Sequence, residues 1–347
     1  MNGVDLASRL VGGSVVAASD ESFGFKERLV DPAEPAFVPG TYDLRGEVVD
    51  GWETRRHAGP AGDWVIVRLG APGRLSNVDV DTRFFSGNHP TACAVDACAL
   101  GRAEDPCGRT VVWTPIVEMT ALKADSHNLL AVADRRRWTH LRLRLASDGG
   151  VARLRAYGEV VPDPGLWADV TIEVSGLEQG GRVEWCSDSF YSSASALVAP
   201  NRPHNMGDGW ETRRCRDIGP DTHDAVIISF AMPADLRRVE IDTSYFVFNA
   251  SVEVSVLGSR CSLDREDGWG KVAFDVPVLA RTPLIPDARQ VFPVDASGLT
   301  ALRVQAYPDG GIARVRALGV PTADGLRALQ RRWEDSVGGG RSDGGGW

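Results

Sequence analysis

The sequence predicts an all-β protein of two tandem jelly-roll-like β-sandwich domains from an internal duplication, followed by a short C-terminal helix. The first observation is a seven-residue block, DGWETRR, which occupies positions 50–56 and recurs unchanged at positions 208–214. The second is that short segments rich in Val, Ile and Leu alternate with polar residues and end at Gly, Pro or Asp, as half-buried strands do. Because helical segments do not alternate with these strands, a Rossmann fold or a TIM barrel is disfavoured and a jelly roll is favoured.

Further blocks recur in the same order and define the repeat. Positions 78–82 match 239–243, and positions 148–156 match 309–317, both at an offset of 161 residues. A unit of about 160 residues has the size of a domain and is too long for a solenoid repeat or a propeller blade. We therefore expect one β-sandwich over residues 10–160 and a second over 166–322. Residues 323–347 are expected to form a helix and a disordered glycine-rich tail.

The strands can be placed in chain order within each copy. Upstream of the repeated block, Ser19-Asp20 matches Ser187-Asp188 at an offset of 168 residues. The predicted strands of the first copy are 65–69, 92–96, 141–145 and 151–155, and those of the second copy are 226–230, 251–255, 302–306 and 312–316. In each copy the last two strands flank an Asp-Gly-Gly turn, which predicts a hairpin. After the second copy, Leu326, Leu329 and Trp333 lie at helical spacing.

Composition and charge limit the class of function. Hydrophobic residues make up 43% of the chain and charged residues 24%, which is typical of globular domains. The formal net charge of -9 would repel a phosphate backbone or an anionic membrane, so a small molecule is the expected partner. No apolar stretch reaches the length of a membrane span, and the first residues do not resemble a signal peptide. We expect a cytoplasmic protein, and a homo-oligomer is compatible with exposed sandwich faces.

The six cysteines are expected to be reduced thiols. They are scattered through the chain without a Cys-x-x-Cys pair, and no export signal places the protein in an oxidising compartment. Because no Cys-x-x-Cys pair is present, a zinc site made of cysteines is also disfavoured.

The doubled block, together with Asp-Thr-x-Phe-Phe-x-Gly-Asn-x-Pro over positions 81–90, resembles the allantoicase family, the allantoate amidinohydrolases of purine breakdown. The resemblance covers nearly the whole chain. It implies that both repeats are jelly rolls. It also implies a hydrolase that splits a C–N bond of allantoate with water, giving ureidoglycolate and urea in allantoin degradation.

The chemistry of allantoate indicates which residues bind it. Allantoate carries a carboxylate and two ureido groups on one carbon, so its site needs a fixed cation and hydrogen-bond acceptors. The predicted substrate-binding residues are Trp52, Arg55, Arg56, Asn88, His89, Glu211, Arg213 and Asp242. In a strand, Glu53 and Arg55 would share one face and Arg56 would point to the other. The alternative is a structural corner, in which the tryptophan lies in the core and the charged residues form ion pairs.

Cleavage of the C–N bond requires general acid–base catalysis. We predict Glu53, His57 and Asp81 as the catalytic residues, because His57 extends the repeated block and Asp81 ends a strand beside a loop. A divalent metal held by His57, His89 and Asp81 stays open, since no two of them have a diagnostic ligand spacing. The sequence itself requires no cofactor.

The two copies differ beside the predicted site. Phe248 stands where the first copy has Gly87, and Ala250-Ser251 replace His89-Pro90. Because glycine lets a backbone approach a ligand closely, a phenylalanine there would partly fill a pocket. The main site is therefore expected in the first copy. The second block would line the same cleft or hold its own domain together.

Two other functions are compatible with the sequence. Jelly rolls also serve as non-catalytic binding modules for carbohydrates or ureides, because a fold alone does not fix a function. An enzyme acting on a related ureide is the third reading. The charged character of the block favours an enzyme over a binding module, whose sites are typically aromatic platforms.

Overall fold

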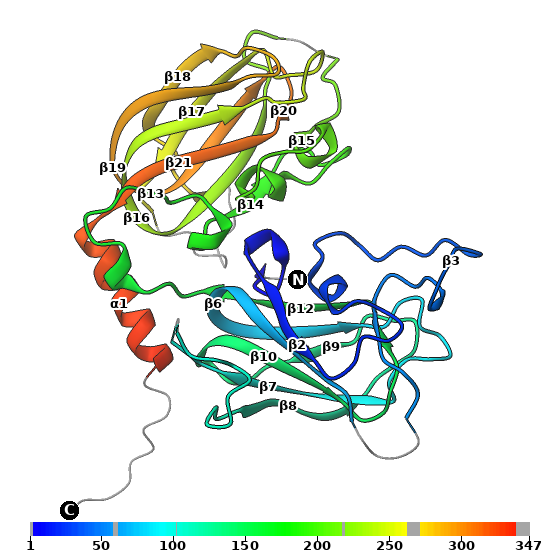
Figure 1. The fold of residues 1–347 in the computed structure, drawn as a ribbon. Coiled ribbons are helices and arrows are strands. Elements are labelled where there is room, and N and C mark those ends of the chain that lie inside the picture. Colours follow the sequence, from blue (N-terminus) through cyan, green and yellow to red (C-terminus); the bar gives the residue numbers. More distant parts are fainter. Residues whose placement is uncertain (1–2, 58–61, 102, 217–218, 262–270, 338–347) are drawn as a thin grey trace, which may run out of the picture. The chain divides into compact units, whose positions relative to one another are not determined.

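Strands dominate both repeats, as the sequence predicts. The computed structural model describes residues 3–57, 62–101, 103–216, 219–261 and 271–337. The chain divides into two compact units, Met1–Pro162 with Trp333–Trp347, and Asp163–Arg332 (Figure 1). Disorder was expected for residues 336–347, but Ser336 and Val337 are helical, and residues 338–347 lie outside the described residues.

The first unit is built mainly on one eight-stranded antiparallel sheet. Its path runs β1-β12-β6-β10-β7-β8, and β2 and β9 also pair with β6. The strands of this unit are β1 (Val4–Asp5), β2 (Ser14–Ala18), β3 (Tyr42–Asp43), β4 (Gly46–Glu47), β5 (Trp52–Glu53), β6 (Trp64–Asp81), β7 (Ala92–Cys98), β8 (Thr114–Ala121), β9 (Leu129–Ala131), β10 (Arg137–Leu145), β11 (Gly150–Val151) and β12 (Arg153–Val160).

The long strand β6 connects two groups of strands. Its first half pairs with β2 and β10, and its second half pairs with β12 and β9. Buried side chains from both groups, such as Val67 and Leu143 in one and Val80 and Leu154 in the other, belong to a single hydrophobic cluster. This arrangement is a β-sandwich whose two layers share one strand.

The second unit repeats this plan. Its seven-stranded sheet runs β13-β21-β16-β19-β17-β18, with β14 paired to β16. The strands are β13 (Ile172–Glu173), β14 (Arg182–Cys186), β15 (Trp210–Glu211), β16 (Asp224–Asp242), β17 (Glu253–Ser259), β18 (Val276–Pro283), β19 (Arg289–Tyr307), β20 (Gly311–Ile312) and β21 (Arg314–Pro321). The internal duplication inferred from the sequence is therefore also a duplication of strand pairing.

The predicted hairpin after the Asp-Gly-Gly turn is wrong. β10 and β12 do not pair with each other, because β6 lies between them and pairs with both. The glycine-rich segment instead supplies β11, which pairs with β5 of the repeated block. In the second unit β20 pairs with β15 in the same way. The recurring Asp-Gly-Gly thus holds the DGWETRR block in place.

Helices are few. The 3-10 helices that lie wholly within the described residues are η1 (Arg9–Val11), η2 (Lys26–Val30), η3 (Pro164–Leu166), η4 (Leu177–Gln179), η5 (Ala194–Val198) and η6 (Met206–Asp208). The C-terminal helix predicted from the sequence is present as α1 (Ala323–Val337), and Leu329 on its apolar face is fully buried. Among the described residues, no helix has the length and hydropathy required to cross a membrane.

Candidate functional site

The repeated block is anchored by its tryptophan. The Trp52 indole is fully buried, and its Nε1–H donates to the carbonyl oxygen of Asp20 at 2.8 Å. Trp210 donates to the carbonyl of Asp188 at the same distance. We expected Trp52 to bind substrate, but a side chain without exposed surface cannot contact a ligand from solvent. Trp52 instead fixes β5 on the core. This is the alternative considered from the sequence, in which the tryptophan of the block is a core residue.

The glutamate of the block meets an asparagine from a distant loop. The Nδ2 atom of Asn88 donates to Oε1 of Glu53 at 2.7 Å. In the second unit Asn249 donates to Oε1 of Glu211, also at 2.7 Å. We call each pair a Glu–Asn clasp. Because it forms independently in both units, the clasp is a feature of the repeat itself.

Electrostatics distinguish Glu53. Partial burial raises the pKa of its carboxyl above the usual value, because removal of water disfavours the charged form. The hydrogen bond from Asn88 and the positive charge of Arg56 act in the opposite direction without cancelling the effect. Glu53 is therefore a carboxyl that holds its proton more readily than an ordinary glutamate, beside a cation.

The two arginines of the block have different roles. Arg55 is tied to Asp20, whose carboxylate accepts the Arg55 backbone N–H at 2.9 Å and lies 3.0 Å from the guanidinium Nε. Burial raises the pKa of Asp20, but hydrogen bonds from Ser22 and Arg55 outweigh it and leave the pKa below its usual value. Within the described part of the chain, the exposed Arg56 guanidinium has no hydrogen bond or ion pair.

The expected strand geometry of these arginines is corrected by the structure. β5 ends at Glu53, so the rule that alternate residues share a face does not extend to Arg55. The sequence argument placed Arg55 beside the glutamate, whereas the charge that acts on Glu53 is that of Arg56. In the second unit, Arg213 likewise pairs with Asp188, with Nε 2.7 Å from Oδ2.

Asp81 lies in a different cluster. It is almost fully buried and accepts hydrogen bonds from Arg83, whose guanidinium also contacts Glu34. His127 Nδ1 lies 2.7 Å from Asp79 and 4.0 Å from Asp81. In the described chain, no hydrogen bond or ion pair joins Asp81 to Glu53 or His57. The interactions of Asp81 are those of an internal ion-pair network, and its counterpart Asp242 lies 3.9 Å from Arg202.

The predicted histidines are also separate from the clasp. His57 Nε2 lies 3.1 Å from Asp63, which also accepts a hydrogen bond from Ser19 at 2.7 Å. His89 is half-buried, and its buried Nδ1 atom has no hydrogen-bond partner in the described structure. No contact within the described residues brings His57 and His89 together with Asp81, so the expected metal-ligand set does not assemble.

One other group of side chains has the composition of a metal site. Donor atoms of Glu34, Asp81 and His127 all lie within 4.8 Å of one another. The Arg83 guanidinium, however, already bonds to both carboxylates at this place. A cation would have to displace that guanidinium, so the residues do not fit a resident metal in this arrangement.

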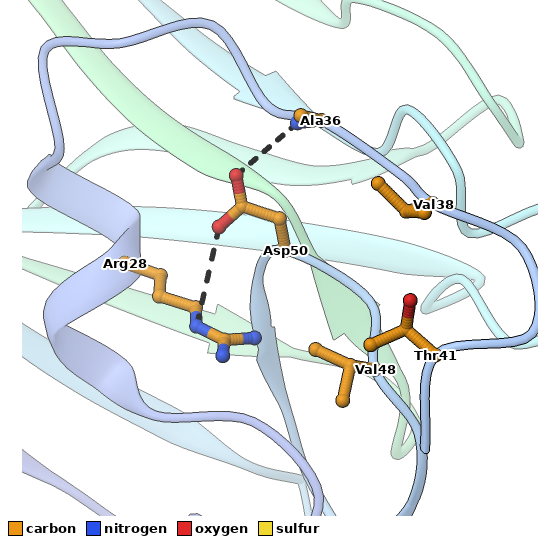
Figure 2. A pocket seen from close by; sticks show the side chains of 6 residues that line it. All are labelled: Arg28, Ala36, Val38, Thr41, Val48 and Asp50. Atoms are coloured by element: carbon orange, nitrogen blue, oxygen red, sulfur yellow. Dashed lines mark hydrogen bonds and ion pairs between the residues drawn. The ribbon is translucent and has the colours of Figure 1, made fainter. Parts of the chain in front are cut away.

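A pocket of about 230 Å³ opens beside the first block (Figure 2). It lies next to a stretch between Asp20 and Asp50 that is ten residues longer than its counterpart between Asp188 and Asp208. Its lining residues are Arg28, Ala36, Val38, Thr41, Val48 and Asp50. Asp50 is already bonded to Arg153 at 2.7 Å, and three lining side chains are apolar. A half-apolar lining whose carboxylate is already engaged is a poor match for the polar ureido groups of allantoate.

Sequence reasoning missed two residues of the site. Asp20 holds Arg55 and the indole of Trp52, and Asn249 completes the second clasp. The recurrence of Ser19-Asp20 as Ser187-Asp188 and of Asn88 as Asn249 contained this signal. Recurrence in both repeats was more informative here than residue chemistry.

Comparisons with known proteins agree in pointing to one family. The family model of the allantoicase repeat matches residues 4–161 and 172–322. A "Probable allantoicase" of Nocardia farcinica is 44% identical over 321 residues, which cover 91% of this chain and 93% of that protein. A "Probable allantoicase" of Streptomyces coelicolor is 40% identical over 95% of this chain and 89% of its own length. A crystal structure of allantoicase from Saccharomyces cerevisiae is 30% identical, with a TM-score of 0.74 over 91% of this chain and 93% of that chain.

Proposed function

This chain belongs to the allantoicase family, and we propose that the Glu–Asn clasp of its first repeat, together with Arg56, forms the catalytic site. Its activity is that of an allantoicase, a hydrolase of the C–N bond that links a ureido group to the central carbon of allantoate. The products are ureidoglycolate and urea.

The residues around the clasp match the needs of the substrate. A planar guanidinium suits a carboxylate, and Arg56 offers one that is exposed and unengaged in the described structure. The Glu53 carboxyl is an acceptor for ureido N–H groups when it is ionised and a donor when it is protonated. Asn88 fixes the position of that carboxyl through Oε1, which leaves Oε2 for the substrate.

The raised pKa of Glu53 suits a proton donor. In the proposed reaction the neutral carboxyl donates its proton to the nitrogen of the departing ureido group as the C–N bond breaks. The lone pair of the remaining ureido nitrogen stabilises the positive charge that develops on the central carbon. Water then adds to this carbon and returns a proton to Glu53. One water is consumed, one urea leaves, and the carboxyl ends in its starting state.

The observation that carries this proposal is the clasp itself, a partly desolvated carboxyl oriented by an amide and next to an exposed guanidinium. The direct experiment incubates the protein with allantoate and follows urea and ureidoglycolate by nuclear magnetic resonance. Ureidoglycolate as an alternative starting substrate tests the discrimination between related ureides. Release of urea from allantoate that does not depend on Glu53 would contradict the site assignment.

The small-molecule substrate is the partner implied by the family. We further propose that the protein works in the cytoplasm without nucleic acid, because its net charge of -9 disfavours binding to polyanions. Association into a homo-oligomer is part of the same proposal and is tested by light scattering at micromolar concentration.

A further inference from the structure

We propose that the second repeat holds a second ureido-acid binding site, built on the Glu211–Asn249 clasp and bordered by exposed aromatic side chains. The inference rests on the proposed function of the first clasp and extends it to the other repeat. It reverses the expectation, drawn from the sequence, that Phe248 obstructs this place.

The polar framework of the first clasp is preserved in the second. Asn249 donates to Glu211 at 2.7 Å, as Asn88 donates to Glu53. Asp188 again holds the following arginine, and Arg213 donates its backbone N–H to Oδ1 at 3.0 Å. The last residue of the block, Arg214, is exposed, and its guanidinium is free of hydrogen bonds and ion pairs in the described structure. A carboxylate-binding cation and an oriented carboxyl are thus both present.

Phe248 does not fill the site. Its side chain is 95% exposed, so it points into solvent. At the matching position in the first repeat, a Cβ built on Gly87 would meet no heavy atom within 4 Å. The sequence difference therefore changes what borders the clasp and leaves the clasp itself open.

The border of the second clasp is apolar. The Phe190 and Tyr191 rings pack edge to face at 4.9 Å and are 64% and 61% exposed. The Arg213 guanidinium lies 5.2 Å from the Phe190 ring centre, and Asn249 also donates to the sulfur of Met206 at 3.0 Å. The positions that match Phe190 and Phe248 in the first repeat are Ser22 and Gly87.

This combination defines the ligand. An exposed guanidinium can bind a carboxylate, and the carboxyl of the clasp can accept hydrogen bonds from N–H donors. The aromatic border can pack against a flat group. A small acid with one planar ureido group meets all three requirements. Large aromatic surfaces kept in solvent without a partner are costly, so their concentration beside a preserved polar site favours a binding role.

The test counts bound molecules per chain. N-carbamoylglycine is the probe, because it has a carboxylate and one ureido group but lacks the second ureido group needed for the proposed cleavage. Equilibrium dialysis of the isotopically labelled probe against the full chain is expected to give two molecules per chain. Arg214→Ala and Arg56→Ala are each expected to reduce binding to one molecule per chain. Both side chains are exposed, so neither change should disturb the fold. Saturation at one molecule in the unaltered protein would overturn the proposal.

Phe248→Gly separates a bordering role from an obstructing one. If Phe248 borders the ligand, its removal weakens the second site several-fold and leaves the first unchanged. Appearance or tightening of the second site in this variant would show that Phe248 obstructs it, and the proposal would fail. Failure of the proposed catalytic site has a different signature, namely unchanged allantoate turnover in Glu53→Gln.

Discussion

The side-chain amide of Asn88 lies 2.7 Å from Oε1 of Glu53, although the two residues are 35 positions apart in the chain. One residue places both. Gly150 pairs with Glu53 in the β5–β11 ladder, and its N–H donates to the carbonyl oxygen of Asn88 at 2.8 Å. The clasp is therefore fixed by backbone hydrogen bonds on both sides and does not rely on flexible side chains alone, which is what a preorganised catalytic group requires.

The first prediction concerns Glu53→Gln. We expect urea release from allantoate to fall roughly 10²- to 10⁴-fold, the usual contribution of a general acid, because the amide cannot donate a carboxyl proton. The hydrogen bond from Asn88 to Oε1 is retained, so the fold should be unchanged. Initial rates over a range of allantoate concentrations and a thermal unfolding curve are the measurements.

The matched control is Glu118→Gln, an exposed glutamate on β8 that lies outside the site. It removes the same charge and should keep full turnover. Equal losses in the two variants would assign the effect to net charge, and a loss of folding in Glu53→Gln alone would return the block to a purely structural role.

The second prediction follows from the direction of the Glu53 pKa. A carboxyl with a raised pKa stabilises the folded state below its ordinary value of 4.5, and this contribution is lost as pH rises through the folded-state value. At higher pH the ionised form of this partly desolvated carboxyl therefore costs stability that glutamine does not. The melting temperature of Glu53→Gln should equal or exceed that of the unaltered protein at pH 7, and the difference should shrink below pH 4.5. A difference that grows in acid would show that the pKa is lowered instead.

The sequence predicted the architecture better than the site. Duplication with alternating strands led to two sandwiches, because burial patterns and recurrence are both written along the chain. The clasp depends on a contact between a loop and a strand, and residue types alone do not reveal which carboxylate that loop reaches. Asp81 and His57 looked chemically suitable, yet their neighbours Arg83 and Asp63 already engage them. Those partners are near in sequence, but only side-chain packing shows that they are bound.

The third prediction compares two glycines near the clasp. Gly149 has φ of 150°, and a Cβ there would lie 2.6 Å from the carbonyl oxygen of Asn88. Gly149→Ala should displace the Asn88 loop and reduce turnover at least tenfold, whereas Gly87→Ala meets open space and should retain activity. Rates and melting temperatures for both variants check this. Strong inactivation by Gly87→Ala would restore the expectation that this glycine lets the protein backbone approach the substrate closely.

The fourth prediction concerns Arg153, a fully buried arginine that bonds to Asp50, the first residue of the block. Its guanidinium donates to the carbonyl oxygens of Ala33 and Asp50 and to the Asp50 carboxylate. Arg153→Ala leaves these acceptors without their donor and should lower the free energy of unfolding by about 3 kcal/mol or more. Arg135→Ala, an exposed arginine, should cost less than about 0.5 kcal/mol. Urea unfolding followed by tryptophan fluorescence measures both.

The last prediction uses the six cysteines, all of which are free in the structure, as expected from the sequence. Burial raises the pKa of Cys93 and Cys98 to about 12, so neither forms a reactive thiolate near neutral pH. Cys107 and Cys261 are exposed and should react first with iodoacetamide at pH 8. Mass spectrometry of digested protein after timed labelling should show these two modified while Cys93 and Cys98 stay unmodified until denaturant is added.

Reducing agent should leave the melting temperature unchanged. A fall of several degrees would reveal a stabilising disulfide, because loss of such a bond costs about 2 to 4 kcal/mol.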